Sequence, residues 1–167
     1  MAAKFISITN FTGQYDIDEN YFDAVIVEKE EERILRDLLG DYQYRLFIAD
    51  CGTGAIPATQ KYKDLLNGKT YTDGIEIAYK GLIEMLVAFS LSAIIRGQNV
   101  STGTGFVKSN NQNSMVLNRW ELDQLANKAY NNGVNLYQQA QKFILFYNSD
   151  YTSWTSKVKN YRKLIDY

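Results

Sequence analysis

The chain contains no histidine among its 167 residues, which removes the side chain that enzymes use most often as a general base. The same absence excludes Ser–His and Cys–His nucleophile pairs and every zinc site that depends on His. Cys51 is the only cysteine, so it has no partner for a disulfide or a redox pair. Without an activating neighbour its thiol is expected to be inert. We therefore expect no catalytic residues, and the chain is not expected to be an enzyme.

Three short motifs imitate nucleotide-binding loops. Gly68-Lys69-Thr70 matches the end of a phosphate-binding loop, but the glycine required five positions before Gly68 is Lys63. The stretches 52–54 and 103–105 both read Gly-Thr-Gly and begin like dinucleotide fingerprints, yet neither is followed by the third glycine. We interpret all three as turns, and no cofactor is expected.

The acidic residues before position 30 have the spacing of a calcium loop without its other requirements. Asp16, Asp18 and Asn20 are correctly spaced, but Tyr21 replaces the necessary glycine, and Val27 stands where a bidentate Glu belongs. Capping of the following helix by Asp16 or Asp18 is the expected role. No metal site is predicted.

Hydrophobic spacing predicts a mainly α-helical bundle that forms one domain over residues 1–167. An extended arm over 1–15 and a docking segment over 150–167 are expected to flank it. The first expected helix covers 22–39 and ends at Gly40, and a short helix over 41–48 follows it. A third begins after Pro57 and ends at Asn67-Gly68. A central buried helix over 79–95 is closed by Gly97, and the last helix covers 118–147, with Gly133 in its apolar stripe. Residues 69–78 are interpreted as a polar turn.

Residues 98–114 are the least globular stretch, with Val100, Phe106 and Val107 as their main apolar side chains. A segment so long and polar is uncommon as a plain connector in a compact domain. It predicts a long extended loop or β-hairpin between the two longest helices that contacts another copy. A mobile surface loop is the alternative. The candidate interface residues in this stretch are Thr102, Gly103, Gly105, Phe106 and Val107.

Aromatic residues are the second signal for an interface. The chain has 13 tyrosines, and Tyr is enriched at protein interfaces because it joins a large apolar ring to a hydroxyl. A tyrosine-rich rim of the core is the alternative. In the tail, Trp154 and Tyr161 are predicted interface residues. Lys157, Lys159, Arg162 and Lys163 lie among them, so a nucleic-acid-binding accessory protein is the alternative function.

The overall charge gives no reason to expect a nucleic acid or an anionic membrane as a tight partner, because 18 basic side chains face 19 acidic ones. The balance changes along the chain: residues 1–83 carry 9 basic and 14 acidic side chains, and residues 84–167 carry 9 and 5. Such a dipolar chain is suited to head-to-tail stacking, although an unevenly charged solvated surface is the alternative.

The start of the chain lacks the pattern of a signal peptide, and the lone cysteine fits a reducing compartment, so synthesis in the cytoplasm is expected. The longest apolar-rich run, 85–95, is well short of the ~20 residues that span a bilayer. No membrane association is predicted.

Several stretches together resemble the head-to-tail connector proteins (neck ring or adaptor proteins) of tailed bacteriophages, of the type found in phages of Bacteroidetes, crAss-like phages included. They are Phe22-Asp23 with Leu38-Leu39-Gly40, Pro57 with the run from Lys61 to Lys69, Tyr79-Lys80-Gly81-Leu82 with Met85-Leu86, and the run from Ser101 to Gly105 with Asn113-Ser114.

The resemblance implies a helical bundle with an extended hairpin or loop and no enzymatic activity. It implies a structural virion protein, made in the host cytoplasm, that forms a homo-oligomeric ring of twelve copies in the neck between portal and tail. Its implied partners are the portal protein and neighbouring neck or tail proteins. DNA would pass through the channel with transient, non-specific contact.

Overall fold

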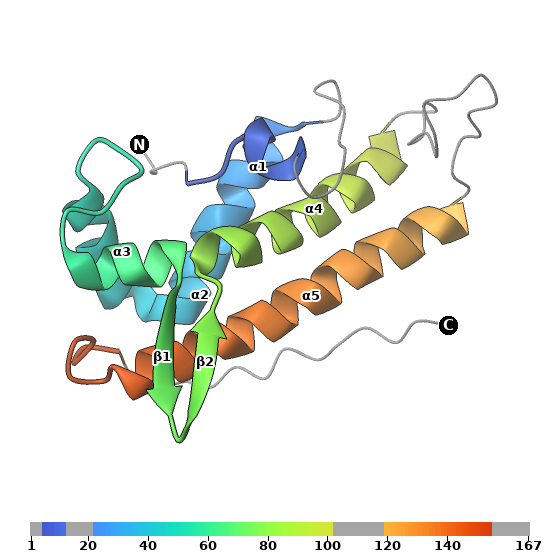
Figure 1. Cartoon of the computed structure of the whole chain (residues 1–167). Helices are drawn as coiled ribbons and strands as arrows, with labels where there is room; N and C mark the ends of the chain where they lie inside the picture. The colour runs from blue at the N-terminus through green and yellow to red at the C-terminus, as the bar shows by residue number, and fades with distance from the viewer. Residues whose placement is uncertain (1–4, 13–21, 102–118, 155–167) are drawn as a thin grey trace.

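The computed structural model describes residues 5–12, 22–101 and 119–154. The predicted mainly α-helical bundle is confirmed, with a small antiparallel hairpin between two of its helices (Figure 1). The elements in chain order are α1 (Ile8–Thr12), α2 (Ala24–Cys51), α3 (Gln60–Asn67), β1 (Lys69–Asp73), β2 (Ile75–Tyr79), α4 (Leu82–Ser101) and α5 (Arg119–Phe146).

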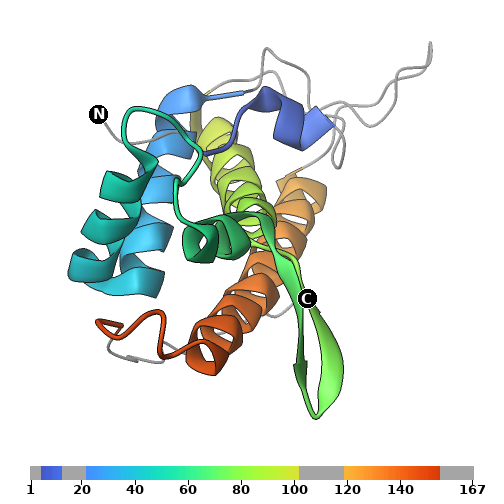
Figure 2. The ribbon, with the colours of Figure 1, turned by 60° about the vertical axis from the view of Figure 1, so that its left-hand side comes forward.

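Helices α4 and α5 run antiparallel, side by side, and α2 packs on α4 (Figures 1 and 2). The consecutive residues 85–92 of α4 are all buried, as predicted for a helix that is apolar nearly all round. Helix α5 continues through Gly133, also as predicted. A Cβ on Gly133 would lie 3.0 Å from three ring atoms of Phe89, so this glycine lets the aromatic ring of α4 approach the backbone of α5.

The start of α2 is capped by Asp23, whose Oδ1 accepts hydrogen bonds from the amides of Val25 (2.9 Å) and Ile26 (3.1 Å). The predicted capping residues Asp16 and Asp18 lie outside the described residues. Gly40 interrupts the helix with a φ of 74°, as expected for a glycine at a helix end, but the helical turns resume at once and continue to Cys51. The element Ala24–Cys51 therefore consists of two helices that meet at a kink at Gly40, as predicted, and the second continues to Cys51, beyond its predicted end at residue 48.

The described part of the expected N-terminal arm belongs to the core. Phe5, Ile6 and Phe11 are buried, and Ile8–Thr12 form a short helix. The buried carboxylate of Glu31 on α2 accepts hydrogen bonds from the amides of Phe5 (3.1 Å) and Ile6 (2.7 Å). The weak apolar alternation of this segment therefore reflects core packing, because Glu31 satisfies the main-chain donors that burial would otherwise leave unpaired.

The segment interpreted as a polar turn is the hairpin β1–β2. Lys69 pairs with Tyr79, Tyr71 with Ile77 and Asp73 with Ile75, about a turn at Gly74. The central helix therefore begins at Leu82, later than predicted, and it continues through Gly97 to Ser101. A hairpin was expected between the two longest helices, whereas this one joins α3 to α4, and residues 102–118 lie outside the described part of the chain. In the described residues no helix is both long and apolar enough to cross a membrane.

Candidate protein interaction surface

The base of the hairpin is fixed by aromatic packing on the last turns of α5. The ring of Tyr79 stacks on Phe143 at 4.3 Å between centroids, and Tyr71 meets Phe143 edge-on at 5.6 Å. The Tyr79 hydroxyl donates a hydrogen bond of 2.9 Å to the carbonyl of Leu65 on α3. Burial raises the pKa of Tyr79 well above its usual value, so this hydroxyl keeps its proton and remains a donor. The hairpin is therefore anchored at a defined angle.

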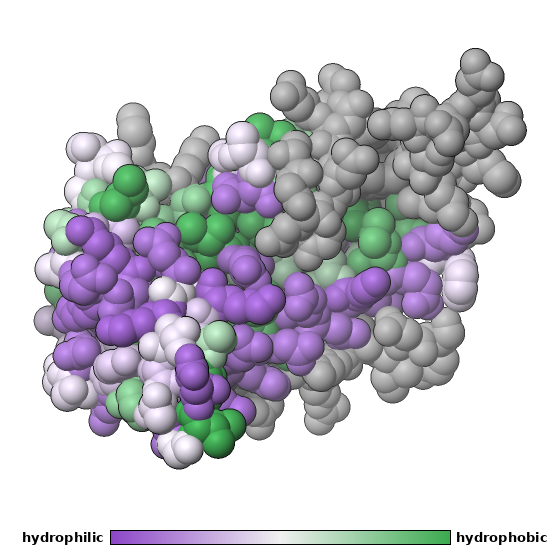
Figure 3. All heavy atoms as spheres, viewed as in Figure 1, coloured by the Kyte–Doolittle hydropathy of each residue, from purple (hydrophilic) through white to green (hydrophobic). Residues whose placement is uncertain are grey.

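The outer half of the hairpin extends past the bundle. The register places Ile75, Ile77 and Tyr79 opposite Asp73, Tyr71 and Lys69, so these side chains share one face of the two-stranded sheet. Tyr71 and Tyr79 are buried and Ile77 is half-buried, but Ile75 is 71% exposed. Figures 1 and 2 show the protruding strands, and Figure 3 shows a hydrophobic spot at their end within a hydrophilic surface.

Phe146 extends this apolar face onto α5. Its ring lies 4.7 Å from that of Tyr71, and the residue is 42% exposed. We call Tyr71, Ile75, Ile77 and Phe146 the hairpin ledge. An apolar surface of this kind on a projecting element is typical of a protein contact.

The main chain of the hairpin is also available for pairing. Apart from the bonds between β1 and β2, the backbone of residues 69–79 makes no hydrogen bond within the described part of the chain. Open strand edges are templates for pairing with another chain. The two exposed acids of the tip, Asp73 and Glu76, form no ion pair there either.

A second exposed aromatic residue lies at the far end of the bundle. Trp120, in the first turn of α5, is 64% exposed, and Arg119 beside it is also exposed. Helix α5 has 28 residues, so at 1.5 Å per residue it is roughly 42 Å long, and Trp120 and Phe146 lie at its opposite ends.

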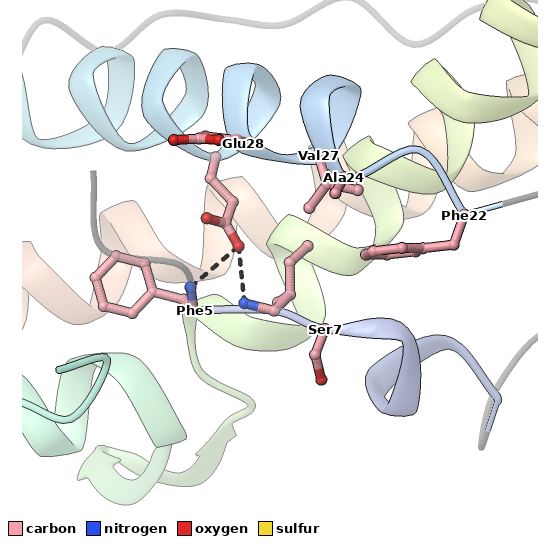
Figure 4. A pocket seen from close by; sticks show the side chains of 8 residues that line it. Phe5, Ser7, Phe22, Ala24, Val27 and Glu28 are labelled. Carbon is pink, nitrogen blue, oxygen red and sulfur yellow. Dashed lines mark hydrogen bonds between the residues drawn. The ribbon is translucent and has the colours of Figure 1, made fainter. Parts of the chain in front are cut away.

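One cavity, of about 350 Å³, lies between the N-terminal segment and the first turns of α2 (Figure 4). Its walls are mostly apolar, with Phe5, Phe22 and Val27 among the lining residues, and Glu28 and Glu31 supply carboxylates. Oε1 of Glu31 is already used to hold the amides of Phe5 and Ile6, so this side chain positions the N-terminal segment.

Cys51 is buried at the end of α2, where burial, with a smaller contribution from Asp50, raises its pKa to about 11. A thiol with this pKa is almost fully protonated near neutral pH and is a poor nucleophile. Within the described ranges, no three of the Cys, Asp and Glu side chains are grouped in a way that could hold a metal ion.

Residues 35–163 match the model of DUF6712, a family of unknown function. The chain belongs to this family. Searches of curated proteins and of solved structures found no match. The DUF6712 match covers α3, the hairpin, α4 and α5, and therefore both exposed ends described above.

Of the predicted interface residues in this DUF6712 protein, Trp154 is the one that the structure describes. It is buried, and its indole N–H donates a hydrogen bond of 2.7 Å to the carbonyl of Leu38 on α2. Trp154 thus packs the chain after α5 against its own domain, which leaves it unavailable as an exposed contact. Thr102, Gly103, Gly105, Phe106, Val107 and Tyr161 lie outside the described residues.

Sequence reasoning missed the hairpin ledge. The signal was the alternation of Ile75, Ile77 and Tyr79 around the turn residue Gly74, which is typical of a hairpin. The basic excess predicted for residues 84–167 does not arise in their described part, where basic and acidic residues are equal in number. The basic residues there are Arg96, Arg119, Lys128 and Lys142, and the acidic ones are Glu84, Glu121, Asp123 and Asp150.

Proposed function

We propose that this protein is a structural subunit that assembles with copies of itself, and that the hairpin ledge is one of its contact surfaces. The observation that carries this proposal is the hairpin itself. Its base is anchored by Tyr71 and Tyr79, while its tip presents Ile75 beyond the bundle. An exposed apolar tip with open strand edges is a liability in a monomer and becomes useful once a partner covers it.

The assembly we propose is a homo-oligomeric ring in the neck of a tailed bacteriophage, between portal and tail, with DNA passing through its channel. Its support is the resemblance of residues such as 61–69 and 79–82 to connector proteins. These residues form nearly all of α3, the base of the hairpin and the start of α4. In this proposal, twelve copies contact each other and the neighbouring portal and tail proteins.

The first test is native mass spectrometry of the purified full chain over a range of concentrations, combined with negative-stain electron microscopy. We expect multimers of defined size with a central opening. A protein that stays monomeric at all concentrations, both alone and with its portal protein, would exclude the proposal.

The alternative, a nucleic-acid-binding accessory protein, depends on residues 157–163, which lie outside the described part of the chain. A DNA titration at several salt concentrations separates the two. Tight binding that weakens steeply with salt, by a protein without multimers, would favour the alternative.

A further inference from the structure

We propose that copies associate head to tail, with Arg119 and Trp120 of one copy seated on the hairpin ledge of the next. This inference rests on the proposed self-assembly and names the two surfaces that meet. The outermost apolar residue of each surface is largely exposed, Ile75 to 71% and Trp120 to 64%. The partner we assign to each surface is the other surface on a second copy.

The apolar parts of the two surfaces are complementary in kind. Trp120 is a large, rigid side chain that projects from the first turn of α5 with 64% of its surface exposed. The ledge offers the exposed Ile75 at its tip and the partly exposed ring of Phe146 at its base, which is backed by Tyr71 at 4.7 Å. A tryptophan held against an aromatic-lined apolar surface is the typical energetic centre of a protein interface.

The charges favour this pairing over a contact between two hairpins. The tip carries two acids, Asp73 and Glu76, and no base. Around the start of α5, the basic residues Arg96, Arg119 and Lys128 exceed the acids Glu121 and Asp123 by one. Two hairpin tips in contact would bring four carboxylates together, whereas the start of α5 brings Arg119 toward two acids. Like charges exclude the wrong partner and opposite charges stabilise the right one.

The positions of the two surfaces determine the kind of assembly. The ledge lies at the end of α5 and Trp120 at its start, so one copy offers both surfaces at opposite ends (Figure 1). A contact between two different surfaces leaves one of each free on every dimer. Growth therefore continues until the chain of copies closes into a ring, provided that the rotation between neighbouring copies closes on itself; otherwise the same contact gives an open filament.

Cross-linking tests the contact directly. Thr72→Cys, beside the hairpin tip, and Asp123→Cys, one turn after Trp120 on α5, are exposed positions that leave Ile75 and Trp120 in place. They are made singly and together in the full chain, and each protein is treated with a short bismaleimide; the buried Cys51 is left in place. We expect the double variant to give a ladder of covalent multimers and each single variant to stay monomeric on a denaturing gel. Ile56→Cys with Asp123→Cys is the matched control, because Ile56 is 75% exposed in the loop before α3 and belongs to neither surface. It should give no ladder.

Charge reversal provides a second measurement that does not depend on cross-linker geometry. Arg119→Glu alone, and Asp73→Lys with Glu76→Lys alone, should each reduce the multimer fraction at least tenfold in native mass spectra. A mixture of the two proteins should assemble again, with the copies alternating, because each junction then pairs opposite charges.

The results divide clearly. If Thr72→Cys alone cross-links to a dimer, the hairpins pair with each other and the head-to-tail contact is wrong. If the wild-type protein forms multimers but neither the double variant nor the mixture behaves as described, self-assembly stands and this contact is wrong. If the wild-type protein is monomeric, the proposed function itself fails.

Discussion

Gly68 and Gly81 lie against each other where the hairpin joins the bundle. A Cβ on Gly81 would be 2.5 Å from the carbonyl oxygen of Leu66 and 2.6 Å from the amide nitrogen of Gly68, and a Cβ on Gly68 would collide with the carbonyl oxygen of Tyr79. Both glycines have a positive φ, 91° at Gly68 and 90° at Gly81. The chain thus enters and leaves the hairpin through two backbones in direct contact, which sets the angle at which the ledge projects.

Gly81→Ala should be strongly destabilising. A non-glycine residue in this backbone region costs about 1–3 kcal/mol, and the new Cβ meets main-chain atoms that no side-chain rotation can move. We expect the free energy of unfolding in urea to fall by more than about 2 kcal/mol. Gly74→Ala at the hairpin turn is the control: φ is 71°, but nothing lies within 4 Å of its Cβ, so a loss of about 1 kcal/mol is expected. Equal losses at the two positions would contradict the close contact.

Alanine should destabilise the protein at Gly133 but not at Gly97. At Gly133 the Cβ meets the ring of Phe89 at 3.0 Å, and overpacking costs about 1–3 kcal/mol. At Gly97 the atom it meets among the described residues is Cδ1 of Ile26, at 2.9 Å, a terminal methyl that can rotate away. Alanine in a helix then gains about 0.5–1 kcal/mol. Urea unfolding should show Gly133→Ala less stable and Gly97→Ala as stable or more stable than the wild type; the reverse order would refute the packing of α5 on α4.

These glycines show where sequence reasoning reached its limit. The predicted helix over 79–95 placed Gly81 inside it, whereas Gly81 precedes the first helical residue, Leu82. The atoms nearest to its Cβ are main-chain atoms of Leu66 and Asn67 at the end of α3 and of Gly68. Hydrophobic periodicity reports which face of an element is buried, and it does not distinguish the last strand residue Tyr79 from a first helical residue. Gly97 was predicted to end a helix because glycine is common at helix C-termini. In the structure Gly97 lies inside α4, where its missing side chain leaves room for the side chain of Ile26, and the sequence does not distinguish these two roles.

Trp154 should be a stabilising residue. Trp154→Phe keeps most of the apolar contact but removes the hydrogen bond to the buried carbonyl of Leu38, which should lower the free energy of unfolding by about 1–2 kcal/mol. Trp120→Phe is the matched control, because Trp120 is exposed and its substitution should change monomer stability by less than about 0.5 kcal/mol. Both are measured at a low, fixed protein concentration. A larger effect at Trp120 than at Trp154 would contradict these placements.

Cys51 should react slowly with thiol reagents at pH 8. With its pKa raised to about 11, on the order of one thiol in a thousand is ionised at that pH, and burial hinders access further. The folded state holds this proton while the unfolded thiol ionises near pH 9, so stability should fall as pH rises from about 9 through about 11. Cys51→Ala should weaken that pH dependence. Labelling of the native protein as fast as in denaturant would show that the thiol is accessible.

The candidate surface was the hardest feature to predict because it depends on tertiary placement. The abundance of tyrosines indicated an interface. Tyr71 and Tyr79, however, are buried at the base of the hairpin, where they support its exposed tip. Ile75 is functional in our account only because α5 ends near Tyr71 and leaves the strand tip uncovered. Residue type does not distinguish Trp154 from Trp120, and only the folded chain shows that the first is buried and the second exposed.

The central claim is that copies of this protein meet at the hairpin ledge, and sedimentation velocity of three full-length proteins tests it most directly. The wild type and Ile56→Asp should sediment as the same multimer, because Ile56 is exposed but lies outside the ledge. Ile75→Asp should sediment as a monomer while its circular dichroism and thermal unfolding match those of Ile56→Asp. If Ile75→Asp sediments as the same multimer as the wild type, the ledge is not the contact and the account is wrong.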